Sequence, residues 1–194
     1  TDYWWTLRGL LVALDQWVRQ GVEPPASAYP KLSEGTLVRA SDVAFPAIPN
    51  VHSPRALPGG TRIANALVAG GGAAGTPLPL LVPEVDADGN ERAGVRLPEI
   101  TVPLATYTGW NFRGARNGGT DMLRALAGSY IPFAPTRADR DRMRDPRRSI
   151  DERYPSAMEY ENRIREAAAD LARQRYVLEA DVPEVAEGEI VQVM

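Results

Sequence analysis

An amphipathic helix at the start of the chain constrains the fold more than any other feature. Its large apolar side chains recur at helical spacing, at Leu7, Leu10, Leu11, Leu14, Trp17 and Val18. Asp2 is suited to cap the N-terminus and Gly21 the C-terminus, and the pair Pro24-Pro25 prevents the helix from continuing. The pattern predicts a helix over residues 3–20 whose apolar face has to be buried, most simply against a sheet.

Residues 22–79 are crowded with proline and glycine and predict an irregular segment. Apolar pairs such as Leu37-Val38 are too short for more than single turns or edge strands. The stretch from Ala69 to Gly75 is rich in glycine and alanine, which is typical of a flexible loop between two subregions. It lacks the Lys-Ser/Thr that follows the glycines of a phosphate-binding loop, so we interpret it as a linker.

The middle of the chain predicts a β-hairpin. Leu80–Val82 and Val95–Leu97 flank Asp86–Asn90, whose Asp-Gly-Asn tolerates the positive φ values of a tight turn. This turn superficially resembles a calcium loop, but its glycine and the next glutamate are wrongly spaced, which favours a solvated turn. Residues 100–112 contain strand-forming side chains, and residues 121–130 predict a short helix.

Two consecutive helices are predicted near the C-terminus. Ser149 and Ser156 each begin a capping box that a glutamate completes three residues later. The second helix extends to about Arg175, and one face carries the apolar residues Met158, Ile164, Ala167, Ala168 and Leu171. The acidic tail from Glu179 is expected to form a last short helix or a frayed end. The predicted fold class is therefore α+β, irregular and loop-rich.

The composition limits the chemistry that the chain can support. It has 194 residues, of which 44% are hydrophobic, and a net charge of −3, which favours neither nucleic acid nor an anionic membrane surface. The absence of cysteine and the presence of one histidine exclude cysteine-ligated metals and sites built on several imidazoles. No apolar run is long enough to span a membrane. We expect no metal, no other cofactor, no nucleic-acid partner and no membrane partner.

No catalytic residue can be assigned within the chain. The Gly-x-Ser-x-Gly elbow, which exposes a nucleophilic serine to its base and oxyanion hole, does not occur. Ser129 follows Gly128, which is better explained as the C-cap of the helix predicted before it. His52 lies in a loop bracketed by prolines, with no neighbouring carboxylate in the sequence to orient its ring, which favours a structural or surface role.

The segment from Thr106 to Arg113 is the best candidate for a substrate-binding wall. It combines aromatic rings, hydroxyl groups, an amide and a guanidinium around one glycine, which suits either a pocket or a buried polar junction. The candidate substrate-binding residues are Tyr107, Thr108, Trp110, Asn111 and Arg113.

Several stretches together resemble a known family. They read LLVPEVDADGNE at 80–91, GVRLPEI at 94–100 and VPLATYTGWNFR at 102–113, with LLVALDQWV at 10–18, GSYIPFA at 128–134 and RRSIDERY at 147–154. Over nearly its whole length the chain is similar to the C-terminal region of bacterial alpha/beta hydrolase domain-containing proteins. In such proteins the nucleophile elbow, the acid and the catalytic histidine are expected earlier in the chain.

The resemblance implies the C-terminal portion of an α/β-hydrolase-type fold. Residues 1–21 would form the last helix of a hydrolase core, 22–79 an irregular segment, and 80–194 a β-hairpin with a helical extension that forms one unit with an upstream core. The complete protein would hydrolyse a small-molecule ester or acyl substrate, and this chain alone would be inactive. The first residue, Thr1, suggests truncation or processing, and the compartment stays open, with export one option.

Two other functions compete with this one. The chain could be a non-enzymatic binding domain that docks a partner through the apolar face of the helix at 3–20. It could also be an autonomous hydrolase that uses Ser129 or Ser53 with His52. The open reading frame before Thr1 and the activity of the isolated chain discriminate among the three.

Overall fold

The computed structural model describes residues 2–54, 81–114, 116, 118, 122–124 and 126–191, and for 189–191 the backbone alone. The α-helices are α1 (Trp4–Gln20), α2 (Pro98–Thr101), α3 (Arg137–Met143), α4 (Ile150–Arg153), α5 (Ala157–Arg173) and α6 (Val182–Val191). The strands are β1 (Leu37–Arg39), β2 (Leu81–Pro83), β3 (Ala105–Thr108) and β4 (Ser129–Pro132). Short 3-10 turns are η1 (Leu32–Glu34), η2 (Ala40–Asp42) and η5 (Glu179–Asp181).

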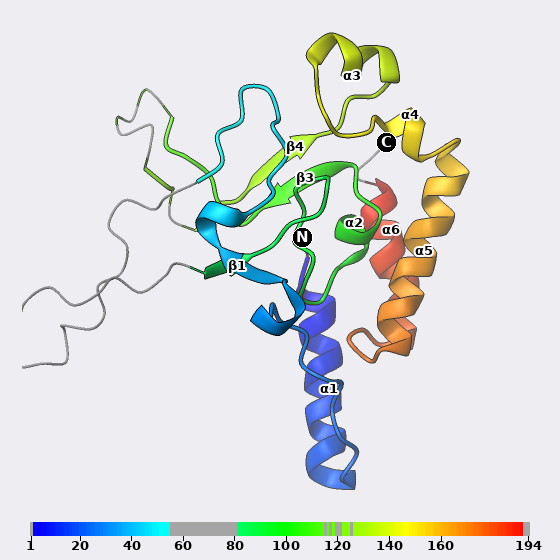
Figure 1. Cartoon of the computed structure of the whole chain (residues 1–194). Helices are drawn as coiled ribbons and strands as arrows, with labels where there is room; N and C mark the ends of the chain where they lie inside the picture. The colour runs from blue at the N-terminus through cyan, green and yellow to red at the C-terminus, as the bar shows by residue number, and fades with distance from the viewer. Residues whose placement is uncertain are drawn as a thin grey trace, which may run out of the picture.

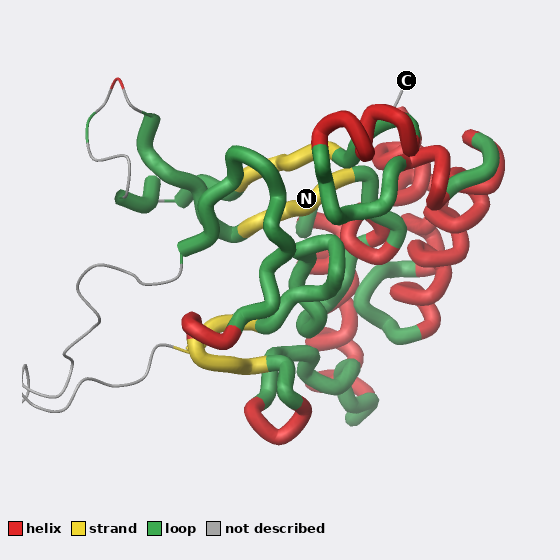
Figure 2. Tube along the Cα trace, turned by 45° about the horizontal axis from the view of Figure 1, so that its top comes forward, coloured by secondary structure: helices red, strands yellow, loops and turns green. Residues whose placement is uncertain are grey.

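Helices and strands occupy different sides of the molecule. Figure 2 shows most of the helices gathered on one side, with the strands and long loops on the other. The described strands form two antiparallel pairs, β1 with β2 and β3 with β4. Leu37 pairs with Pro83 in the first, and Thr108 with Ser129 in the second. The α+β, loop-rich fold class predicted from the sequence is confirmed.

The hydrophobic core lies on the helical side. α5 packs against α6 and α2, and the buried side chains between them include Ile164, Leu171 and Val177. Trp5 and Leu10 of α1 pack against the same cluster. Gly9 brings α1 close to the turn after α5, because a Cβ on Gly9 would lie 2.6 Å from the backbone oxygen of Tyr176. One end of α1 is therefore anchored in the core.

The predicted first helix is confirmed, with Gly21 as its left-handed C-cap at a φ of 71°. Its capping differs slightly from the prediction, because Tyr3 occupies the N-cap position while the Asp2 carboxylate accepts from the Trp4 N–H at 3.0 Å. Most of the apolar face lacks the expected cover in the described structure. The exposed side chains include Trp4, Leu7, Leu11, Leu14, Trp17 and Val18. Figure 1 shows α1 projecting away from the rest of the structure.

The predicted β-hairpin is wrong in its pairing but correct in its turn. β2 pairs with β1, and residues 95–97 form no strand. The turn does form: the Asp86 N–H donates to the Asn90 oxygen at 2.8 Å, and Gly89 has a φ of 83°. Pairing across it is limited to one bridge between Val85 and Glu91. The arm at 95–97 instead precedes α2, where Pro98 at the first position favours a helical turn.

Two further predictions need correction. Residues 98–101 are helical, so the strand predicted over 100–112 is reduced to β3. No helix is found among the described residues of 121–130. Leu123 instead forms a bridge with Phe112, and β4 begins at Ser129. Gly128 is therefore no helix cap; it lies beside the Thr108 backbone, where a Cβ would approach the Thr108 oxygen to 2.2 Å.

The predicted capping box is complete at Ser149, and at Ser156 the hydrogen bond of the serine side chain forms. The Ser149 N–H donates to Glu152 Oε2 at 3.0 Å before α4, and Ser156 Oγ accepts from the Glu159 N–H at 3.2 Å before α5. The predicted apolar face of α5 is buried except for Met158, which is 69% exposed because it lies about 120° around the helix from Ile164. The tail from residue 179 forms η5 and α6.

The stretch 69–75, interpreted as a linker, lies outside the described residues. No described helix is long and apolar enough to cross a membrane. The division of the chain at residues 21 and 79 stays a prediction.

Candidate functional site

A large cavity lies on the strand side of the molecule. Its volume is about 510 Å³, which suits a small organic molecule. β1 leads into its wall through η2, and the end of β2, the turn at 86–91 and the end of β3 complete it. The lining residues are Ala40, Ser41, Val43, Phe45, Ser53, Pro54, Val82, Pro83, Val85, Gly89, Glu91, Tyr107, Thr108, Gly109 and Trp110. We call this space the aromatic cavity.

Hydrogen bonds hold the end of β3 in place beside the cavity. The side chain of Asn90, which is fully buried, accepts from the Tyr107 N–H at 2.7 Å and donates to the Ala105 oxygen at 3.1 Å. Thr108 Oγ1 donates to the Trp110 oxygen at 2.5 Å and accepts from the Ser129 N–H at 3.1 Å. A buried amide that satisfies two backbone groups fixes the position of the strand.

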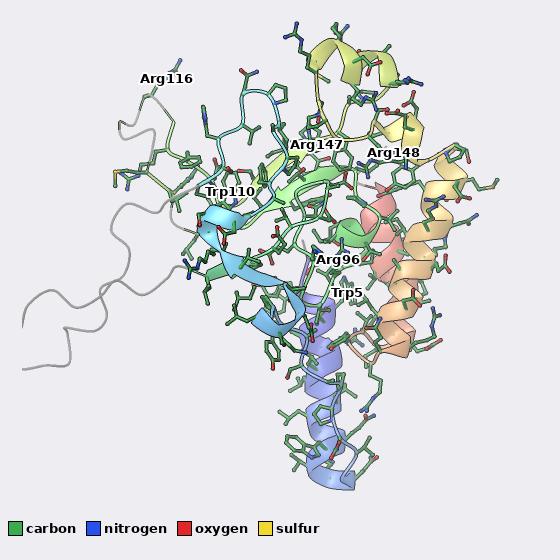
Figure 3. The ribbon with its side chains drawn as sticks, in the orientation of Figure 1. Trp5, Arg96, Trp110, Arg116, Arg147 and Arg148 are labelled. Carbon is green, nitrogen blue, oxygen red and sulfur yellow. The ribbon has the colours of Figure 1, made fainter. Side chains whose placement is uncertain are left out.

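The part of the lining that includes Phe45 is fixed by the carboxylate of Glu84. This buried side chain accepts from the backbone N–H of Ala44 at 3.1 Å and of Val85 at 2.8 Å. The loop that carries Phe45 is thereby joined to the segment after β2. The Phe45 ring then meets Trp110 edge to face, with 5.5 Å between centroids. Figure 3 shows Trp110 beside η2, on the side of the molecule away from α5.

Glu91 contributes a carboxylate to the cavity. Its side chain is exposed, and it makes no hydrogen bond or ion pair with the described residues. Burial of the carboxyl group among the surrounding atoms nevertheless raises its pKa. A carboxylate on a concave wall is reached by solvent from one side and is desolvated by protein atoms on the others. Glu91 combines the two in this way. No other charged residue belongs to the described lining.

A buried arginine joins β3 and β4 to the segment before α4. Arg147 Nη1 donates to Thr106 Oγ1 at 2.8 Å and to the Ile131 oxygen at 2.9 Å, and Nη2 donates to the Pro132 oxygen at 3.1 Å. Its Nε and Nη2 also donate to the two carboxylate oxygens of Asp145, at 3.0 and 2.6 Å. Every N–H of the guanidinium is therefore used. Figure 3 shows Arg147 between the strands and α4.

A second arginine joins the turn at 86–90 to the helical side. Arg153 forms a two-pronged ion pair with Asp88, in which Nη1 lies 2.7 Å from Oδ2. Its guanidinium also lies over the Phe133 ring, 4.1 Å from the centroid. Asp86 is paired with Arg96 at 3.0 Å. Both carboxylates of the predicted solvated turn thus serve to attach it to the rest of the fold.

The buried ion pair makes a prediction about acid stability. Burial by itself raises the pKa of Asp145, but hydrogen bonds from the Arg147 side chain and backbone and the Arg147 charge outweigh it, so the pKa is lowered. Because the folded-state pKa lies below the ordinary value of 3.8, the stabilisation is complete above that value and is lost as pH falls through the folded pKa. We expect the free energy of unfolding in urea to decrease as the pH falls below about 4.

The variant Asp145→Asn removes the titrating group and should flatten this decrease. Asp15→Asn is the matched control, because Asp15 is an aspartate of α1 whose pair with Arg19 is exposed. Equal pH dependence in the wild type and in Asp145→Asn would show that Asp145 contributes nothing to acid stability.

The structure brings three of the five predicted site residues to the aromatic cavity. Tyr107, Thr108 and Trp110 belong to its lining. Asn111 lies outside it, where its amide donates to the Gly128 oxygen at 3.2 Å and ties two loops together. Arg113 is exposed in a separate hollow with Arg124. A role in substrate binding stays a prediction for all five.

The serine and histidine side chains considered for an autonomous hydrolase are not assembled into a triad in the described structure. Ser129 Oγ donates to the Trp110 oxygen at 2.9 Å, so it serves the loop rather than a base. Ser53 lines the aromatic cavity. His52 is exposed and makes no hydrogen bond or ion pair with the described residues.

Sequence reasoning missed Phe45, Glu84 and Glu91. Phe45 and Glu91 lie far apart in the sequence and in segments interpreted as an irregular loop and a solvated turn, and no periodicity places them in one wall. One signal in the sequence could have indicated them: Glu91 and Phe45 are an acidic and an aromatic residue in loops next to short apolar segments.

A family model described as "Alpha/beta hydrolase domain" matches residues 3–187. No curated protein and no solved structure gave a significant match to the chain. The matched range includes α1, both strand pairs and the helical side, so it covers every element that builds the aromatic cavity. The chain belongs to the alpha/beta hydrolase domain family.

Proposed function

We propose that this chain is the C-terminal part of an α/β-hydrolase-type enzyme that cleaves ester or related acyl bonds. The nucleophile, its histidine and the acid would be supplied by an upstream hydrolase core, in the same or in a separate chain. The observation that carries the proposal is the exposed apolar face of α1 in a chain that belongs to a hydrolase family.

The exposed face forms one continuous stripe. Its side chains stand at positions 4, 7, 11, 14 and 18, and this alternation of three and four residues keeps them on one line along a helix. Leu11 and Val18 are 67% and 77% exposed, and Trp17 beside them is 51% exposed. Monomeric proteins rarely leave such a contiguous apolar patch in water. A sheet of a hydrolase core would cover it.

The chemistry of this chain is also consistent with a supporting role. Its sequence contains no nucleophile elbow. Its one histidine, His52, is exposed, and the loop around it contains no carboxylate that could orient the ring. In the complete enzyme, a serine of the core would attack the ester carbonyl while a histidine takes up its proton and returns it to the leaving alcohol. Water would then release the acid by the reverse sequence of proton transfers.

In this scheme the present chain would bind the substrate and exclude water. Tyr107 and Trp110 would form an apolar wall for the acyl or alcohol group. An aromatic wall of this kind positions a substrate and lowers the local dielectric constant, which strengthens the electrostatic stabilisation that the core provides.

Dye binding tests whether the α1 stripe is an open surface. The isolated chain is expected to enhance the fluorescence of a hydrophobic dye such as 1-anilinonaphthalene-8-sulfonate, because the stripe offers it an apolar site. The double variant Leu11→Gln, Val18→Gln should lose most of this enhancement.

The matched control is the double variant Leu32→Gln, Met158→Gln, because both side chains lie outside α1 and are 66% and 69% exposed. It should retain the enhancement. If the two double variants bind the dye equally, the α1 stripe is not the exposed surface that the proposal requires.

The same stripe also supports a second candidate, a non-enzymatic binding domain that docks a partner through α1. The two functions share the surface and differ in its occupant. Recovery of esterase activity on addition of a hydrolase core favours the first, and a partner that binds without any activity favours the second.

A further inference from the structure

We infer that the aromatic cavity binds a molecule with an apolar or aromatic body and a protonated amine, and that the amine pairs with the carboxylate of Glu91. This inference goes beyond hydrolysis, because it names the charge and the shape of the bound molecule. That the molecule is a substrate rests on the proposed function, whereas its binding does not.

The charge of the described lining is negative and comes from one residue. Glu91 is the sole ionisable acid or base in that lining apart from the phenol of Tyr107. The other polar side-chain groups are the hydroxyls of Ser41, Ser53 and Thr108 and the indole N–H of Trp110, none of which carries a positive charge. An anionic ligand would be repelled at this wall, and a cation would be attracted.

Glu91 is also the carboxylate that the fold leaves without a partner near this cavity. Its neighbours in the turn, Asp86 and Asp88, are paired with Arg96 and Arg153. Glu84 is satisfied by two backbone N–H groups. Glu91 has no such contact with the described residues, and burial raises its pKa. A bound ammonium group would compensate this desolvation.

The remaining walls suit the body of such a molecule. Val43, Val82 and Val85 provide aliphatic surface, and the rings of Phe45 and Trp110 meet edge to face. Aromatic faces attract cations as well as apolar groups, so rings and carboxylate favour the same ligand class. The volume of about 510 Å³ holds an aromatic amine.

Calorimetric titration of the 194-residue chain with three probes of one shape tests the inference. At neutral pH, 2-phenylethylamine is a cation, 2-phenylethanol is neutral and 3-phenylpropanoate is an anion. We expect the amine to bind about tenfold more tightly than the alcohol, and the anion to bind more weakly than either. Equal affinity for the amine and the alcohol would overturn the inference.

Variants locate the site and separate charge from shape. Glu91→Gln should weaken amine binding by about fivefold and leave alcohol binding unchanged, because it removes the ion pair and keeps the volume. Trp110→Ala should weaken both. Glu166→Gln, an exposed site on α5, is the matched control and should change neither. Unchanged amine affinity in Glu91→Gln, with the fold intact by circular dichroism, would refute the assignment of Glu91.

The outcomes also separate this inference from the proposed function. Amine binding that depends on Glu91, in a protein that shows no esterase activity even with its core, would support the site and contradict the hydrolase. Esterase activity with no preference for the amine would support the hydrolase and overturn the inference.

Discussion

Replacing Arg147 with alanine is expected to lower the free energy of unfolding by about 3–5 kcal/mol. The Arg147 and Asp145 side chains are 2% and 7% exposed, so the change leaves a buried carboxylate without its partner. It also deprives the oxygens of Ile131, Pro132 and Thr106 of their donors. Buried acceptors without partners add to the cost. Urea denaturation followed by circular dichroism measures the effect.

The neighbouring arginine provides the matched control. Arg148 donates to the Glu152 backbone oxygen at an exposed position, and Arg148→Ala should cost less than about 1 kcal/mol. Arg147→Lys should recover only part of the loss, because an ammonium group cannot reproduce the fork that reaches both strands and Asp145. Equal stabilities of Arg147→Ala and Arg148→Ala would contradict the role of Arg147 as the link between β3, β4 and the segment before α4.

Substituting Gly128 with alanine is the second prediction with a large effect. The added Cβ would lie 2.2 Å from the backbone oxygen of Thr108, and a backbone atom cannot move aside as a flexible side chain can. The strands would have to separate where Thr108 pairs with Ser129. We expect a loss of about 1–3 kcal/mol in the free energy of unfolding, as for other overpacked sites.

Gly109→Ala is the control, because Gly109 is in the same region and a Cβ there would meet nothing within 4 Å. The free energy of unfolding of this variant should stay within about 0.5 kcal/mol of the wild-type value. A Gly128→Ala variant as stable as Gly109→Ala would mean that the close approach of the two loops is not required for the fold.

The helices were largely predictable from sequence because their signals are local. The apolar spacing and Gly21 defined α1, and the serines at 149 and 156 defined the starts of α4 and α5. Met158 was assigned to the apolar face although the helical period places it about 120° around the helix from Ile164. Capping and periodicity depend on residues within one or two turns, so they need no knowledge of the tertiary fold.

The strands were predicted less well because their partners are distant. β2 has equally good strand formers on its C-terminal side, yet it pairs with β1, more than forty residues earlier in the chain. The helix expected over 121–130 failed because β4 begins at Ser129 and pairs with β3. Pairing of this kind depends on tertiary contacts that outweigh local propensity.

The candidate site was predictable in part. Tyr107, Thr108 and Trp110 were recognised because mixed aromatic and hydroxyl residues cluster in one short segment. Phe45 and Glu91 were not, because only the folded chain brings them to the same wall. The sequence pattern also did not show that Asn111 lies outside the cavity lining, where its amide donates to the Gly128 oxygen.

The most direct test of the proposed function is the hydrolysis of p-nitrophenyl acetate by two proteins. One is the present chain alone, and the other is the chain joined to the polypeptide encoded immediately before Thr1. We expect the first to show no turnover and the second to hydrolyse the ester, with activity abolished by serine-to-alanine substitution in its Gly-x-Ser-x-Gly elbow. Turnover by the isolated chain that is lost in His52→Ala would contradict the proposal and establish an autonomous enzyme.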